Sequence, residues 1–323
     1  MSPARPSVTL GYSLSTEEHA APDLVRFAQQ AEAAGFAYGS ISDHFHPWVD
    51  AQGESPFAWS VMGAIAASTT TFGLGTGVTC PTMRYHPAIV AQAAATMATL
   101  LPGRFFLGLG TGEQLNEHIV GRRWPPYEIR AAMLEEAIGI IRALWTGEPV
   151  DHHGEHFTVE QARLYSLPDQ PPPIIVAAAG PEAARLAARV GDGLINPSGD
   201  AEVADAYREA GGNGPRYLQI SVCWHEDEAE ARRLAHQLVP SVALPGELGN
   251  LLPTPAHYEE AVQLVREEDI AKVITCGPDP QAHRDRIQAG IDAGYDHIHV
   301  YQVGPDQAGF FRFYEREILP AFR

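Results

Sequence analysis

Short apolar runs alternate with amphipathic stretches along the whole chain. Residues 8–13 alternate like a short strand, and residues 22–35 then carry apolar side chains at helical spacing before a glycine. The same rhythm predicts further strands at residues 38–42, 72–80, 105–110, 174–179, 193–196, 217–224, 272–276 and 297–303. It predicts helices at residues 57–70, 88–101, 130–145, 181–190, 201–210, 227–238 and 256–267.

About eight strand–helix units follow one another without a low-complexity linker, which favours a single (β/α)8 TIM barrel of the α/β class over a doubly wound sheet. The chain of 323 residues is long enough for such a barrel, so we expect one domain over residues 1–323. Two insertions interrupt the rhythm. Residues 150–166 contain an extended surface excursion, and residues 240–255, rich in Pro, Gly and Leu, are predicted to form a loop.

The barrel prediction has a geometric consequence for residues that are far apart in the sequence. The chemistry of such barrels lies at the carboxyl ends of the strands. We therefore expect the polar and small residues that follow the predicted strands to meet at one mouth: Asp43, His44, Cys80, Glu113, Gly180 and Ser198.

Charge and composition narrow the class of partner. The formal net charge of −18 disfavours nucleic acids and anionic membranes, since both need a basic face, and favours a small-molecule substrate. No apolar run approaches the roughly 20 residues of a membrane span, and residues 1–6 lack the features of a secretory signal, so a cytoplasmic protein is expected. The three cysteines, Cys80, Cys223 and Cys276, have no metal-ligand spacing and are expected to be buried free thiols.

Residues 42–48, Ser-Asp-His-Phe-His-Pro-Trp, concentrate polar and aromatic side chains directly after a predicted strand. His44 suits a base that removes a hydroxyl proton, with Asp43 orienting it, provided that a bend brings both side chains inward. The alternative is structural: Asp43 caps a local turn and Trp48 belongs to the core.

Residues 108–113, Gly-Leu-Gly-Thr-Gly-Glu, do not fit a dinucleotide fingerprint, because the third glycine is misplaced and no acidic residue follows at the required distance. These glycines, like residues 177–180, form either a tight turn or a close backbone approach to a flat ligand. Glu113 is either a general acid whose pKa is raised by burial or a residue stabilised by a helix N-terminus.

Two other kinds of catalytic site are not supported. His152, His153 and His156 lie in the surface excursion, without cysteine or a fixed helical pairing, so we expect no metal site. A Ser-His-Asp hydrolase is also disfavoured, because no Gly-x-Ser-x-Gly elbow follows any predicted strand.

Four motifs together resemble a known family. They are SDHFHPW at residues 42–48, CPTMRYHP at residues 80–87, GLGTGEQLNE at residues 108–117 and GDGLINPSG at residues 191–199. In this order, and over nearly the whole chain, they resemble the coenzyme F420-dependent glucose-6-phosphate dehydrogenase group of the bacterial luciferase-like superfamily.

The resemblance implies a TIM barrel, often homodimeric, that binds a 5-deazaflavin in its mouth and moves a hydride between C5 and a substrate carbinol. It implies four catalytic positions: Asp43 at the deazaflavin, His44 as base, Trp48 lining the site and Glu113 as proton donor or stabiliser. The cofactor-binding positions that it implies are Asp43, Gly77, Val78, Cys80, Gly110, Thr111, Gly112, Asn116, Ala177, Ala178 and Gly180, and Ser198 at the sixth strand end is expected to join them.

One departure from the family concerns the substrate. Members that hold a sugar phosphate use two lysines and an arginine, and Asp200, Gly249 and Val273 stand at the matching positions. The sequence therefore predicts that glucose 6-phosphate is not the substrate, unless Lys272 compensates. A neutral polyol, free sugar or secondary alcohol is expected, or a carbonyl or unsaturated compound in the reductive direction, with contacts from Trp48, Trp224, Tyr12 and residues 244–252.

Two alternatives to an F420-dependent oxidoreductase stay open at this level. One is a flavin mononucleotide-dependent monooxygenase on the same barrel. The other is a deazaflavin-binding protein without turnover. The combination of Asp43, His44, Trp48 and Glu113 argues against the second alternative.

Overall fold

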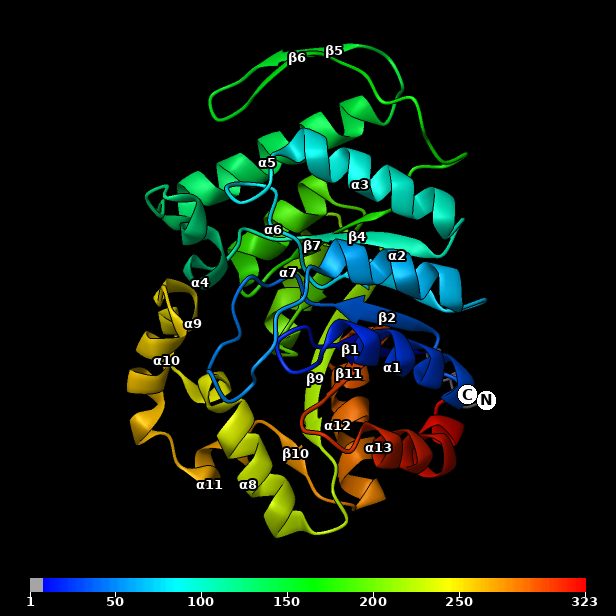
Figure 1. Cartoon of the computed structure of the whole chain (residues 1–323), viewed down its shortest axis with the longest axis vertical. Coiled ribbons are helices and arrows are strands. Elements are labelled where there is room, and N and C mark those ends of the chain that lie inside the picture. The colour runs from blue at the N-terminus through cyan, green and yellow to red at the C-terminus, as the bar shows by residue number, and fades with distance from the viewer. Residues whose placement is uncertain (1–7) are drawn as a thin grey trace.

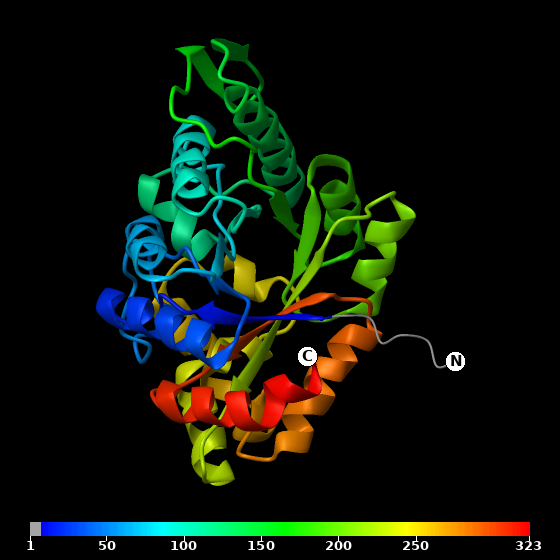
Figure 2. The ribbon, with the colours of Figure 1, turned by 90° about the vertical axis from the view of Figure 1, so that its right-hand side faces the viewer.

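Eight parallel strands form a closed barrel in the computed structural model, which describes residues 8–323 (Figures 1 and 2). Neighbouring strands pair in the order β1, β2, β3, β4, β7, β8, β9 and β11, and β11 returns to β1 with His297 opposite Thr9. This closure confirms the predicted TIM barrel. The strands are β1 (Thr9–Leu14), β2 (Tyr38–Ile41), β3 (Gly73–Thr76), β4 (Phe105–Leu109), β7 (Ile174–Ala177), β8 (Gly193–Asn196), β9 (Arg216–Cys223) and β11 (His297–Gln302).

Helices cover the outside of the barrel because each has an apolar face to bury. In the first helix, Leu24, Phe27 and Ala31 are buried, and Gly35 ends the helix with a φ of 100°. The covering helices are α1 (Ala21–Ala34), α2 (Ala58–Ser68), α3 (Pro87–Leu100), α5 (Tyr127–Leu144), α6 (Pro181–Val190), α7 (Ala201–Glu209), α8 (Glu228–Leu238), α12 (Pro280–Asp292) and α13 (Gln307–Phe313). A short helix, α4 (Gln114–Glu117), and the turn His118–Val120 follow β4.

Large side chains fill the lower part of the barrel, and small ones lie above them. Tyr38, Phe106 and Tyr217 form the centre of a buried cluster with Ile175 and Ile195. Towards the carboxyl ends of the strands, the positions are occupied by residues such as Gly77, Gly110 and Ala177. The bulky side chains therefore fill the barrel interior near the starts of the strands, and small residues follow at the strand ends.

The first insertion confirms the predicted excursion. The antiparallel strands β5 (Val150–His153) and β6 (Thr158–Ala162) form a hairpin beside α5, away from the barrel (Figure 1).

The second insertion is not the loop that its Pro and Gly content predicted. It folds into the turn Pro240–Ala243 and the short helix α9 (Leu248–Leu251), followed by α10 (Pro255–Ala261), the turn Val262–Leu264 and α11 (Glu267–Ile270). Leu244 and Leu252 bury part of their surface against a cluster of Val49, Leu115 and Tyr258. This apolar contact overrides the local preference for a loop.

The predicted strand at residues 272–276 shortens to β10 (Thr275–Cys276), which lies at the edge of β9 beyond the end of β8. It is not one of the eight barrel strands, because β9 pairs with β8 along its first half and with β10 only at its end. Similarly, β3 stops at Thr76 and not at Cys80. Within residues 8–323, no helix has the length and apolar character needed to cross a membrane.

Candidate active site

Asp43 is buried after β2 and connects its own segment to helix α2 and to the segment after β3. Its Oδ2 atom accepts hydrogen bonds from Thr79 Oγ1 at 2.6 Å and Trp59 Nε1 at 3.3 Å. Its Oδ1 atom accepts one from Tyr85 at 3.0 Å and lies 3.2 Å from Nη2 of Arg84. These partners occupy both oxygens, so the expectation that Asp43 orients His44 is wrong.

His44 is oriented by Glu17, which lies in the segment after β1. The Nδ1 atom of His44 is 3.2 Å from Oε1 of Glu17. The other carboxylate oxygen of Glu17 accepts hydrogen bonds from Ser15 at 2.8 Å and Ser42 at 2.7 Å. Glu17 is thus a fixed, buried acceptor at the base of the site.

The surroundings of His44 determine its tautomer. The neighbours of Nδ1 are acceptors, namely the carboxylate of Glu17 and the carbonyl oxygen of His46 at 3.3 Å. Nδ1 must therefore carry a hydrogen, and Nε2 of the neutral ring has a free lone pair. The Nε2 atom faces Glu113, whose Oε2 lies 3.5 Å away.

Glu113 follows β4 and is the titratable group that faces Nε2 of His44. Burial raises the pKa of its carboxyl group, and the charge of Glu17 acts in the same direction, whereas His44 and Asn116 oppose the shift. Its side chain is 28% exposed, so the carboxyl group can still meet a ligand. A carboxylic acid that keeps its proton at higher pH suits a proton donor.

Asn116 connects the Glu113 segment to the His44 segment. Its Oδ1 atom accepts hydrogen bonds from the amides of Phe45 at 2.9 Å and His46 at 3.3 Å, and its Nδ2 donates to Glu113 at 3.2 Å. Asn116 is buried, and its hydrogen bonds hold the His44 segment against the Glu113 segment. Its predicted cofactor contact stays a prediction.

Arg84 forms a buried network with two acids. Its guanidinium group pairs with Asp43 at 3.2 Å and with Glu117 at 3.4 Å, and the side chains of both acids are at most 1% exposed. The backbone amide of Arg84 also donates to Glu117 at 2.8 Å. This network fixes the segment after β3 against those after β2 and β4.

Trp48 borders the site from the side of the second insertion. The centroid of its ring lies 5.1 Å from that of His44 and 5.2 Å from that of Tyr258. The ring is half-buried, so part of its surface faces the mouth.

Glycines at neighbouring strand ends let the backbone pack closely against the segment after β3. A Cβ atom at Gly110 would come within 2.7 Å of Val78, and Gly112 has a φ of 82° beside Cys80. Arg130 donates to the carbonyl oxygen of Gly112 at 3.2 Å and fixes this turn. On the neighbouring strand, Gly180 has open space around it, and the N-terminus of α6 carries no side-chain cap. Gly77, Thr111, Ala177 and Ala178 lie in the same strand-end segments.

Some predicted contacts do not reach this mouth. Tyr12 donates to Gln307 and packs against Phe311 in the core, and Trp224 packs against Phe313. Ser198 differs from these two residues: it follows the end of β8, is exposed, and donates to Asn196 at 3.1 Å and to Asp200 at 2.7 Å, and its predicted cofactor contact stays a prediction. The prediction of mouth contacts from Tyr12 and Trp224 is therefore wrong.

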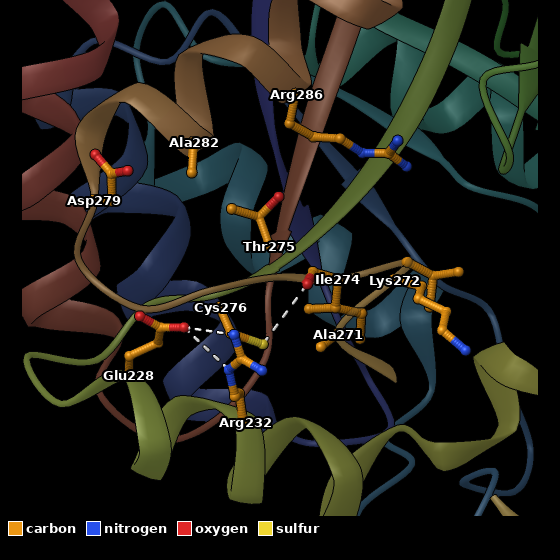
Figure 3. A pocket seen from close by; sticks show the side chains of 11 residues that line it. Glu228, Arg232, Ala271, Lys272, Ile274, Thr275, Cys276, Asp279, Ala282 and Arg286 are labelled. Atoms are coloured by element: carbon orange, nitrogen blue, oxygen red, sulfur yellow. Dashed lines mark hydrogen bonds and ion pairs between the residues drawn. The ribbon is translucent and has the colours of Figure 1, made fainter. Parts of the chain in front are cut away.

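Two cavities lie away from the mouth. One, of about 320 Å³, opens between α8, β10 and α12 and is shown in Figure 3. Lys272 lies at its edge and donates to Asp269 at 2.8 Å. The other, of about 660 Å³, contains residues at the starts of the strands, such as Thr9, Gly73 and Phe105. Neither is lined by Glu17, His44 or Glu113.

The structure also describes the other candidates from the sequence. Cys80 and Cys223 are buried free thiols, whereas the free thiol of Cys276 is only partly buried. His152 pairs with Glu136 at 2.9 Å on the outer hairpin. In the described part of the chain, no cluster of three or more His, Cys, Asp or Glu side chains is arranged to hold a metal ion.

The functional residue that the sequence interpretation missed is Glu17. Its position, three residues after the end of β1, is the signal that could have identified it, since every other candidate also follows a strand. Arg84 and Arg130 were missed as well, because their partners lie 18 to 41 residues away in the sequence.

Three comparisons relate the chain to known proteins. A family model described as luciferase-like monooxygenase matches residues 4–297. The chain is 38% identical to an F420-dependent glucose-6-phosphate dehydrogenase of Beutenbergia cavernae, covering 97% of each chain. It is 40% identical to an F420-dependent hydroxymycolic acid dehydrogenase of Mycobacterium tuberculosis, covering 97% of this chain and 88% of the relative.

A solved structure shares the whole fold. An F420-dependent secondary alcohol dehydrogenase in complex with an F420-acetone adduct superimposes with a TM-score of 0.91 at 30% identity, over 98% of this chain and 99% of the other. The family model and the full-length similarity agree with the barrel architecture. The chain therefore belongs to the luciferase-like monooxygenase family.

Proposed function

We propose that this protein is an F420-dependent oxidoreductase that transfers a hydride between C5 of a deazaflavin and an alcohol or sugar carbinol. The arrangement of Glu17, His44 and Glu113 carries the proposal, because it places a base and a partly buried acid next to each other after β2 and β4. The relatives whose names specify glucose 6-phosphate, hydroxymycolic acid and a secondary alcohol are F420-dependent dehydrogenases of hydroxyl-bearing compounds.

The residues at the mouth fit a flat cofactor. Glycine and alanine at the ends of β4 and β7 leave a surface without large side chains. We propose that the deazaflavin is held by this surface and by its neighbours, namely Asp43, Gly77, Val78, Cys80, Gly110, Thr111, Gly112, Asn116, Ala177, Ala178, Gly180 and Ser198. When bound, the deazaflavin supplies the hydride acceptor at C5.

The protein's own side chains accept the hydroxyl proton of the substrate and stabilise the resulting charge. Nε2 of His44 takes the hydroxyl proton of the alcohol, and the carboxylate of Glu17 balances the positive charge that forms on the ring. Glu113, whose pKa is raised by burial, offers a hydrogen-bond donor beside Nε2. Trp48 excludes water from one side of the carbinol.

The test is to titrate the purified protein with F420 and then follow the loss of its visible absorbance with a panel of alcohols and sugars. We expect binding at micromolar protein and turnover with at least one carbinol. His44→Ala should retain the dissociation constant for F420 and lose turnover. Absence of F420 binding would overturn the proposal, as would a bound flavin with oxygen consumption in the presence of a reductase.

We further propose that the enzyme is a cytoplasmic homodimer. Two large apolar side chains are exposed: Phe57, directly before α2, is 53% exposed, and Ile89, on α3, is 58% exposed. Contact with a second copy of the chain would bury them, which supports a dimer. Sedimentation at micromolar concentration should give twice the mass of one chain, and cell fractionation should recover the enzyme with cytoplasmic markers. A monomer, or recovery with membranes, would contradict this part of the proposal.

A further inference from the structure

An apolar wall begins next to the proposed base and leads away from it. We use this name for the partly buried side chains of Trp48, Leu244 and Leu252, which pack against a buried cluster of Val49, Leu115 and Tyr258. The ring of Trp48 lies 5.1 Å from that of His44 and meets the ring of Tyr258 edge-on at 85°. The wall therefore begins directly beside the ring of the proposed base.

The wall is built by defined contacts. The hydroxyl group of Tyr258 donates to the carbonyl oxygen of Gly249, which ties α10 to α9. Thr254 caps α10 by accepting from the amide of His257. Helix α9 also lies against α4, the helix that directly follows Glu113. The wall is thus fixed to the segment that carries the proposed acid.

Two further leucines extend the apolar surface outwards. Leu248 and Leu251, on α9, are 38% and 44% exposed. Exposed apolar side chains next to a site are typical of ligand contact, because a bound apolar ligand removes their surface from water.

The three positions that the family resemblance matches to a sugar-phosphate clamp carry no positively charged side chain in this chain. Asp200 carries a carboxylate, Gly249 has no side chain, and Val273 presents an isopropyl group that is 41% exposed. Lys272, the nearest cation in the sequence, is paired with Asp269 at 2.8 Å. None of these three side chains offers a cation to an anionic substrate group.

We propose, on the basis of the proposed function, that the substrate is an alcohol with an extended apolar chain that lies along the apolar wall while its carbinol meets His44. Trp48, Leu244 and Leu252 then determine specificity, and Leu248 and Leu251 contact the distal part of longer chains. Each methylene buried against the wall raises kcat/KM about four-fold, which corresponds to ~0.8 kcal/mol per CH2.

The experiment uses the full chain loaded with F420 and the series 2-butanol, 2-hexanol, 2-octanol and 2-decanol, with glucose and glucose 6-phosphate as polar comparisons. We expect kcat/KM to rise steeply along the series and to be lower for both sugars. In the double variant Leu244→Ala/Leu252→Ala, the rise per methylene should fall at least two-fold while the dissociation constant for F420 is unchanged.

Leu264→Ala is the matched control, because Leu264 is 90% exposed outside the wall and its loss should leave the dependence on chain length intact. Leu251→Lys tests the exposed leucines of α9. In this variant kcat/KM should fall more for 2-decanol than for 2-butanol.

Equal or falling kcat/KM along the series, with turnover of a sugar, would overturn this inference and leave the proposed function standing. A change from dimer to monomer in Leu251→Lys, without any change in chain-length dependence, would assign the exposed leucines to a subunit interface and contradict the inference. Absence of F420 binding would instead overturn the proposed function itself.

Discussion

Glu17 lies 3.2 Å from Nδ1 of His44, although the two residues follow different strands. The serines at positions 15 and 42 hold the second oxygen of Glu17, so its carboxylate cannot turn away without losing two hydrogen bonds. This relationship makes Glu17 a positioning residue, because it acts on the substrate only through His44.

Glu17→Gln should lower kcat by about 10- to 1,000-fold, since the amide keeps the shape but removes the charge that balances the imidazolium ring. The dissociation constant for F420 should change less than two-fold. The matched control is Glu136→Gln, which breaks a similar Glu–His pair with His152 on the outer hairpin and should leave kcat unchanged. Equal effects of both substitutions would contradict the assignment.

Arg84→Met should destabilise the protein by about 3–5 kcal/mol, because it leaves the buried carboxylates of Asp43 and Glu117 without their cation. Urea unfolding at pH 7 measures this change. Arg189→Met removes an exposed pair with Glu135 and should cost at most about 1 kcal/mol. If the two variants unfold at the same urea concentration, the buried network does not stabilise the mouth.

Glu18 should make the stability depend on pH. Burial raises its pKa from 4.5 to about 7, although hydrogen bonds from Tyr301 and Gly304 oppose the shift. The folded state therefore keeps a proton that the unfolded state releases, and stability is lost as the pH rises from about 4.5 to about 7.

Glu18→Gln should remove this dependence. We expect the variant to exceed the parent by about 2–3 kcal/mol at pH 8 and to differ little at pH 4. Urea titrations at the two pH values measure the difference. A difference that is the same at both pH values would rule out the titration of Glu18 as its cause.

Introducing three positive charges should allow this protein to bind a sugar phosphate. Asp200→Lys, Gly249→Lys and Val273→Arg, combined in one variant, place three cations at the positions that match the sugar-phosphate clamp of the family. We expect kcat/KM for glucose 6-phosphate to increase at least ten-fold relative to that for glucose. High activity of the parent protein with glucose 6-phosphate would show that these positions do not determine the substrate.

Local sequence patterns predicted most of the fold. The strand and helix of residues 8–35 were recognisable from their spacing and from the glycine that ends the helix. The helical turns of residues 240–255 were not, because Leu244 and Leu252 pack against a cluster that includes Val49 and Leu115, which are distant in the sequence. The single-domain organisation and the individual cofactor contacts remain predictions.

The sequence by itself determined the barrel class, the placement of residues 42–48 and 108–113 at strand ends, and the resemblance to F420-dependent dehydrogenases. Periodicity and local motifs carry that information, because they depend on neighbours along the chain. Only the tertiary structure decided that His44 pairs with Glu17 and that Asp43 belongs to the Arg84 network. These pairings arise when barrel closure brings separate strand ends together, and the spacing of residues within one segment does not encode them.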